Sequence, residues 1–159
     1  MSGREVTMVR KLGFAAGHRY WHPDRTEAEN RAAFGPFASP YNHGHTYGLE
    51  VGVRGMVDAS TGMVVNKDVD DDVRRHVIAV YDGRSINDEV PDFATVAPTL
   101  ENLLADIRTR IEPVLPPACR LVSLLLSESP TLFAELDPTT MNTTLTRTYE
   151  FAAAHRLHV

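Results

Sequence analysis

The sequence predicts an α+β domain, in which two helices pack on one face of an antiparallel sheet. Strand-like patterns occupy residues 5–16 and 43–57 near the start, and 119–128 and 132–136 near the end. Helical patterns fill the stretch between them, at 68–81 and 100–114. Because the strands come in groups and do not alternate with helices, the order favours α+β over a parallel α/β sheet.

The first strand leads into a long connection. Residues 5–16 are rich in β-branched and apolar side chains, as a strand requires. Residues 21–42 then carry three prolines and Gly35 among polar residues, so they are expected to be irregular with one helical turn at 27–33. A loop of this length inside a compact domain is often functional.

A second strand follows this connection at 43–57. Alternation places His43, His45 and Tyr47 on one face, because side chains in a strand repeat every two residues. The polar turn 58–62 then predicts a hairpin, with its second strand at 63–66.

Two amphipathic helices come next. The first buries a stripe with four-residue spacing, made of Val69, Val73, Val77 and Tyr81, and ends at Gly83. The second begins after Thr99, a suitable N-cap, and its apolar face is Leu100, Leu103, Leu104, Ile107 and Ile111.

Length and composition narrow the class of protein. The 159 residues correspond to about one domain. A net charge of -5 argues against a strongly basic nucleic-acid binder, and the single cysteine, Cys119, cannot form an internal disulfide. Without a signal-like N-terminus or a run of about 18 apolar residues, we expect a soluble cytoplasmic protein that does not enter the membrane.

The end of the chain repeats its beginning. Residues 145–159 align with 8–22 at an offset of 137, and the coinciding pairs are Phe14/Phe151, Ala15/Ala152, Ala16/Ala153, His18/His155 and Arg19/Arg156. The match predicts one domain at 1–137, with 138–159 as a linker and the start of a second, incomplete repeat. Alternatively, these residues form an extra strand that pairs with a neighbouring subunit.

Histidines supply the strongest chemical signal. His43 and His45 point the same way from one strand and can bind a single ion, and His18 ends the preceding strand. Three neutral imidazoles with an open fourth position are typical of a catalytic zinc. The alternative is that the pair only lines a strand with hydrogen-bonding side chains.

Two carboxylates add further candidates. Glu128 closes a buried strand, where a charge must be paired or bind a ligand, unless the residue lies at an exposed strand end. Asp82 lies near the end of the first helix. Thr99 and Glu101 also fit a simpler role, as the N-cap and first-turn acid of the second helix.

Together these segments resemble a known family. The strings FAAGHR, PYNHGHTYG, TGMVVN, DEVPDFA, PTLEN and LSES, in this order over residues 8–136, are similar to 6-pyruvoyl tetrahydropterin synthase and to the related 6-carboxytetrahydropterin synthases of deazapurine biosynthesis. The resemblance implies the tunnelling fold, with a four-stranded antiparallel sheet and two helices on one face. It also implies trimeric barrels, usually paired as hexamers, with active sites between subunits.

The resemblance also assigns roles to residues. Zinc would be held by His18, His43 and His45, and Glu128 would accept N–H bonds from the edge of a pterin. Thr99 matches a pocket-lining position, and Glu101 follows it. The implied enzyme is a carbon–oxygen lyase that removes triphosphate from dihydroneopterin triphosphate, in tetrahydrobiopterin or queuosine biosynthesis.

Two family positions depart from this pattern. Phe37 stands where the family has the cysteine that removes a proton, and Gly83 replaces the histidine of an Asp–His pair. Asp82 is the candidate catalytic residue that remains from this pattern, and Tyr41, Tyr47 and His22 are the alternatives for a substitute acid or base. Positioned proton-transfer groups contribute about 10²–10⁴-fold to a rate. The sequence therefore predicts weak or altered catalysis, or else a non-catalytic pterin- and zinc-binding or structural half of a tandem protein.

Overall fold

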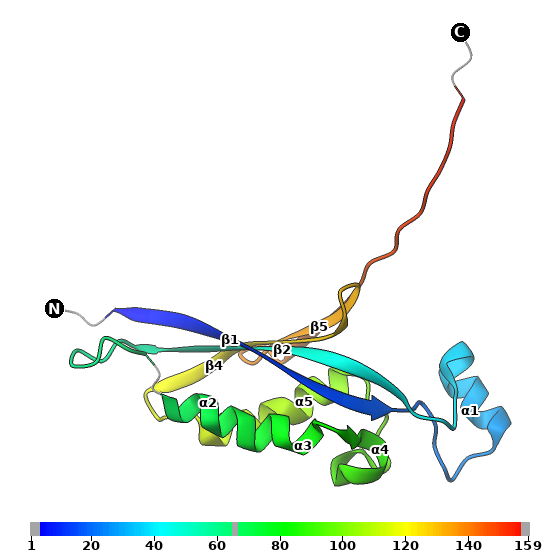
Figure 1. Ribbon diagram of the computed structural model, residues 1–159, viewed down its shortest axis with the longest axis horizontal. Helices are drawn as coiled ribbons and strands as arrows, with labels where there is room; N and C mark the ends of the chain where they lie inside the picture. Colours follow the sequence, from blue (N-terminus) through cyan, green and yellow to red (C-terminus); the bar gives the residue numbers. More distant parts are fainter. Residues whose placement is uncertain (1–3, 65–66, 157–159) are drawn as a thin grey trace.

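Two long strands form the centre of the molecule. The computed structural model describes residues 4–64 and 67–156, and within them β1 (Glu5–His18) pairs antiparallel with β2 (His43–Met56) along their whole length. Both strands begin and end within two residues of the predicted bounds. The two long helical stretches lie on one side of this sheet (Figure 1), which confirms the predicted α+β class.

The sheet contains six strands, so the expectation of four strands was wrong. Its order is β3-β1-β2-β4-β5-β6. The expected strands β4 (Cys119–Ser129) and β5 (Leu132–Asp137) are joined by β3 (Arg84–Ser85) and β6 (Asn142–Arg147). The two-residue β3 is too short to leave a sequence pattern, and the polar β6 is held by its antiparallel pairing with β5.

The hairpin expected after β2 does not form in the described residues. Met63 and Val64 are not in a strand, and positions 65 and 66 of the expected strand lie outside the described residues. The turn itself is present, because the Asp58 carboxylate accepts hydrogen bonds from the backbone N–H groups of Ser60 and Thr61. Both edges of β2 are already paired, with β1 and β4, so no edge of β2 is left for a returning strand.

The first long helix changes its winding along its length. It runs through α2 (Lys67–Val73), the π-helical segment η2 (Arg74–Ile78) and α3 (Ala79–Tyr81). In a regular α-helix, side chains four residues apart drift by about 40° around the axis. The wider π turn offsets this drift, and the whole predicted stripe from Val69 to Tyr81 is buried.

The second long helix, α5 (Leu100–Ile111), completes the core. Its five predicted apolar residues are all buried, and it packs against β4 and β5. The rings of Phe14 on β1, Tyr47 on β2 and Tyr81 on α3 stack with centroids 5.0 and 5.3 Å apart. This aromatic contact joins the helix layer to the central strands.

The long loop is folded around one buried side chain. It contains α1 (Glu27–Phe34) and the 3₁₀ turn η1 (Gly35–Phe37), beyond the ends of β1 and β2 (Figure 1). Asn30 is fully buried, accepts from the His22 N–H and donates to the carbonyls of His22, Arg25 and Thr26. These bonds fix the segment that leads to Phe37.

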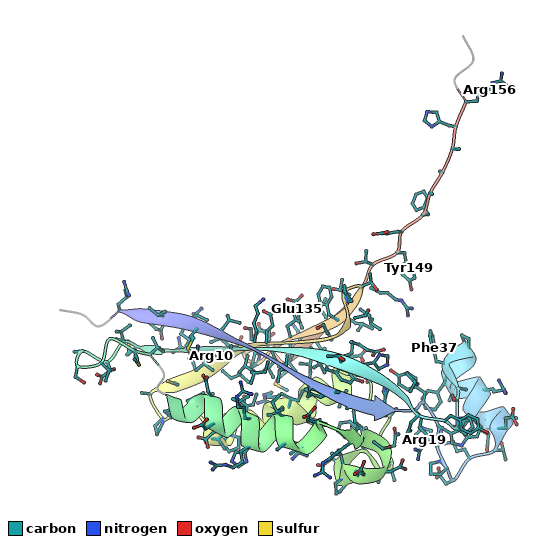
Figure 2. All side chains as sticks on the ribbon, in the orientation of Figure 1. Arg10, Arg19, Phe37, Glu135, Tyr149 and Arg156 are labelled. Carbon is teal, nitrogen blue, oxygen red and sulfur yellow. The ribbon has the colours of Figure 1, made fainter. Side chains whose placement is uncertain are left out.

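Short helical segments complete the structure. They are α4 (Ile86–Glu89), η3 (Pro91–Phe93) and η4 (Glu112–Val114). After β6 the chain leaves the body as an extended tail, along which Tyr149 and Arg156 project in Figure 2. Among the described residues, no helix is long and apolar enough to cross a membrane.

The packing of α5 gives a direct test of the core. Ile107 is completely buried, and truncation to alanine removes its contacts and leaves a cavity. We expect Ile107→Ala to lower the free energy of unfolding by about 2–5 kcal/mol in urea titrations at fixed protein concentration. The exposed neighbour Thr109 serves as control, and Thr109→Ala should change the free energy of unfolding by less than about 0.5 kcal/mol. Equal effects would contradict this packing.

Candidate metal and ligand site

The register of the central strands assembles a histidine cluster. His18 lies opposite His43, and Ala16 lies opposite His45, so the three imidazoles share one face at the end of the β1–β2 ladder. Their potential ligand nitrogens all lie within 4.8 Å of one another. The ring centroids are 4.5–5.1 Å apart.

The hydrogen bonding of this cluster suits a metal. His18 is fully buried, and its Nδ1 lies 3.1 Å from the Pro98 carbonyl oxygen. A carbonyl can only accept, so the proton sits on Nδ1 and Nε2 carries a free lone pair. Nε2 of His18 and Nε2 of His45 are buried and make no hydrogen bond within the described part of the chain. Two orphaned imidazole nitrogens fit the donor set of a zinc site.

The electrostatics keep these imidazoles neutral. Burial, followed by the neighbouring His43, lowers the pKa of His18 to about 4, although the Pro98 carbonyl opposes this shift. Burial likewise lowers the pKa of His43 and of His45. Since only a neutral imidazole can bind a metal, the site is in its binding-competent form near neutral pH.

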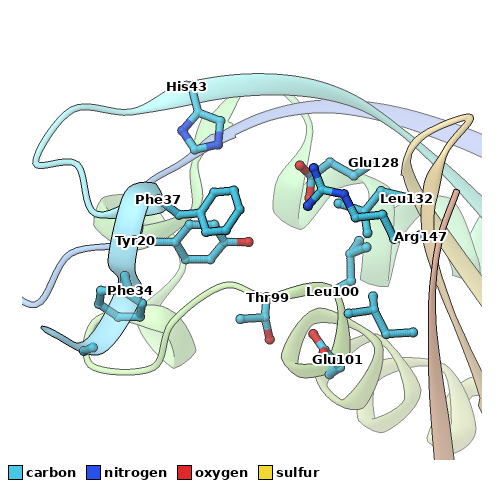
Figure 3. A pocket seen from close by; sticks show the side chains of 12 residues that line it. Tyr20, Phe34, Phe37, His43, Thr99, Leu100, Glu101, Glu128, Leu132 and Arg147 are labelled. Atoms are coloured by element: carbon cyan, nitrogen blue, oxygen red, sulfur yellow. The ribbon is translucent and has the colours of Figure 1, made fainter. Parts of the chain in front are cut away.

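A pocket of about 430 Å³ opens beside the cluster (Figure 3). It brings together His43, Glu128, Thr99 and Glu101, four of the residues that the sequence analysis assigned to the site. Phe37, which the sequence resemblance aligns with a cysteine, also lines it, and its side chain is 57% exposed. The remaining lining residues are Tyr20, Ala33, Phe34, Leu100, Leu132, Leu145 and Arg147.

Glu128 links the pocket to the histidines. Its Oε1 lies 3.1 Å from Nε2 of His45, within ion-pair distance but without the alignment of a hydrogen bond. Burial raises the pKa of Glu128, while the charges of His43 and Arg147 act in the opposite direction. The carboxylate therefore has unused acceptor capacity toward a ligand in the pocket.

Thr99 and Glu101 lie at the start of α5 and also border the pocket. The Thr99 side chain accepts a hydrogen bond from the backbone N–H of Asn102, which caps α5, and Glu101 is the acid of the first turn. The cap therefore positions the start of α5 at the ligand site.

Asp82 is not among the residues that line this pocket. Its carboxylate is exposed and accepts a hydrogen bond from the backbone N–H of Ala15, 2.9 Å away. The next residue, Gly83, has φ +73°, a conformation that side chains other than glycine rarely adopt. Within one chain, the Asp82 carboxylate therefore bonds to the backbone of β1 and does not face the pocket beside the histidine cluster.

Several lining residues were missing from the sequence analysis. Tyr20 follows His18 by two positions, so strand alternation could have indicated it. Burial raises the pKa of its hydroxyl to about 12. Leu145 and Arg147 come from β6, whose sequence gave no sign of contact with the pocket.

Comparison with known proteins places this chain in a family. The family model for 6-pyruvoyl tetrahydropterin synthase matches residues 7–139. This chain belongs to the 6-pyruvoyl tetrahydropterin synthase family. The 6-pyruvoyl tetrahydrobiopterin synthase of Poecilia reticulata is 36% identical over 110 residues, covering 69% of this chain and 75% of that protein. The human protein of the same name is 34% identical over 113 residues, covering 70% and 78%.

Solved structures agree with this placement. The 6-pyruvoyl tetrahydropterin synthase of Caenorhabditis elegans superimposes with a TM-score of 0.69 and 26% identity, covering 92% of this chain and 98% of that chain. An uncharacterised protein from Wolinella succinogenes has a TM-score of 0.55 at 17% identity, covering 85% and 99%. That second likeness concerns the fold alone.

The low pKa of His18 predicts how stability depends on pH. An unfolded imidazole protonates near its ordinary pKa of 6.5, whereas folded His18 resists protonation until about pH 4. The unfolded state therefore binds more protons between these values, and metal-free protein should lose up to about 3 kcal/mol as pH falls through this window. Urea titrations at pH 7.5, 6 and 5 measure the slope. The variant His18→Gln should show a smaller slope, and an equal slope would contradict this origin.

Proposed function

We propose that this chain is a zinc-dependent, pterin-binding member of its family, with weak or altered elimination of triphosphate from dihydroneopterin triphosphate-like substrates. One observation carries the proposal. Two orphaned imidazole nitrogens lie beside a pocket that contains a half-buried carboxylate, Glu128, and an exposed phenyl ring, Phe37. The imidazole nitrogens would bind a metal and the carboxylate a ligand, whereas the phenyl ring cannot transfer a proton.

Different residues of the chain would bind the metal and the organic ligand. His18, His43 and His45 would hold zinc, with the Nδ1–Pro98 contact fixing the orientation of His18. Zinc there supplies Lewis acidity toward the oxygens of a substrate side chain. Glu128 accepts N–H bonds from the ring edge of the ligand and orients it.

Proton transfer is where this chain differs from the family pattern. Phe37 offers no base, and Gly83 has neither a side chain nor a backbone conformation that a histidine would adopt without strain. Asp82 remains as the candidate catalytic acid or base. Because it does not line the pocket of its own chain, we propose that it serves the site of a neighbouring subunit in a homo-oligomer, a trimer or hexamer.

A second function, without catalysis, also has support. Residues 142–147 pair with β5, and residues 148–156, which repeat the sequence of β1, extend away from the body with Phe151 92% exposed. The chain would then be the binding or structural half of a tandem protein, with 138–159 leading into a second unit. Tight binding of zinc and pterin without turnover favours this alternative, and binding of neither favours a purely structural half.

The metal site can be tested by its stoichiometry. We expect about one zinc per chain after dialysis, measured by elemental mass spectrometry. His43→Ala and His45→Ala should each lose most of this zinc, because two imidazoles bind it much more weakly than three. His76→Ala removes a half-buried histidine of η2 and should keep it. Equal loss in all three variants would contradict the assignment.

The missing base can be tested by restoring it. Zinc-loaded wild-type protein should release triphosphate from dihydroneopterin triphosphate slowly, and Phe37→Cys should raise that rate by about 10²-fold or more. Phe37→Ala opens the pocket equally without a thiol and should give no comparable gain. Wild-type turnover at a rate ordinary for enzymes, about 1 s⁻¹ or above, would refute the proposed degeneracy.

A further inference from the structure

Arg147 reaches the pocket from a segment that the family match does not include. The match ends at residue 139, and β6 begins at Asn142. Pairing with β5 places Arg147 opposite Leu132, and the Thr148 N–H donates to the Thr131 carbonyl just beyond. The strand therefore fixes the backbone that carries Arg147 at the pocket wall.

The exposed guanidinium of Arg147 lies near two aromatic rings. Its Cζ lies 5.9 Å from the ring centroid of Phe37 and 5.4 Å from that of Tyr149. Within the described residues, Arg147 makes no hydrogen bond and no ion pair at salt-bridge distance. Its planar set of N–H donors is therefore available to a ligand in the pocket.

The neighbouring carboxylate decides what these donors can bind. Glu128 and Arg147 line the same pocket (Figure 3), and the Arg147 charge acts on the Glu128 carboxylate. A phosphate or carboxylate group placed between them would be repelled by Glu128. A neutral carbonyl oxygen would not, and it would accept from Arg147 while adjacent N–H groups donate to Glu128.

We propose that Arg147 is a specificity-determining residue that donates a hydrogen bond to the ring carbonyl of the ligand. Together Glu128 and Arg147 would select a heterocycle whose N–H groups and carbonyl adjoin, which is the 2-amino-4-oxo edge of a pterin. This inference rests on the proposed function, since it requires that pterins bind in this pocket. It adds a recognition group that comes from β6.

A pair of ligands tests this selection. We would titrate zinc-loaded protein with a 2-amino-4-oxopteridine and with the 2,4-diaminopteridine bearing the same side chain, and measure the ligand's fluorescence. In the diamino compound an amino donor replaces the carbonyl and faces the Arg147 donors. Wild-type protein should prefer the oxo compound, and Arg147→Met should reduce that preference by about 10- to 100-fold.

The ratio of the two affinities makes the result specific. A variant that is partly unfolded loses both affinities equally and leaves the ratio unchanged, so a fall in the ratio reports recognition. Arg120→Met is the matched control, because Arg120 lies at the far end of β4 from Glu128 and pairs with Glu5. It should leave the ratio as in wild type.

The outcomes separate this inference from the proposed function. An unchanged affinity ratio in Arg147→Met overturns the role of Arg147. An effect that is confined to ligands with a phosphorylated side chain also overturns it, because that effect would indicate an anion site. If wild-type protein binds neither pteridine, the proposed function itself fails and the inference falls with it. A reduced ratio with retained binding of both supports the assignment.

Discussion

The antiparallel register of β1 and β2 is the constraint on which the rest of the structure depends. It aligns His18 with His43 and leaves His45 two positions further along the same face. A slip of one residue would turn one strand's side chains to the opposite face and separate the histidines. The same face carries Phe14 and Tyr47, which stack under the helices, so one register determines both the core and the cluster.

Periodic patterns explain what the sequence predicted well. The histidines, the stripe from Val69 to Tyr81 and the cap at Thr99 each follow from a local rule, and the structure has all of them. The strands β3 and β6 follow from no local rule, because a two-residue bridge and a polar edge strand are stabilised by their partners. Arg147 was missed for the same reason, since only tertiary pairing brings β6 to the pocket.

The candidate binding residues and the two positions that the resemblance aligns with proton-transfer residues occupy different kinds of structure in this chain. The histidines lie in or at the end of the β1–β2 ladder, where pairing fixes the backbone, and Glu128 lies in β4 at an irregularity between Ser127 and Ser129. Phe37 and Gly83 lie in a short 3₁₀ turn and in the turn after α3. A side chain such as Phe37 in an exposed turn touches few neighbours, so under the proposed function the reactive groups could change while the ligand site is kept.

The π-helical segment lets the first long helix hold one residue more than a regular helix would. Removing one residue within Arg74–Ile78 would leave Val69 and Tyr81 eleven positions apart in a regular α-helix, roughly three full turns. The buried stripe would then keep its face toward the sheet, and the helix would shorten by about 1.5 Å. The π-helical segment is therefore the place in this helix where the chain can gain or lose one residue without exposing Val69 and Val73.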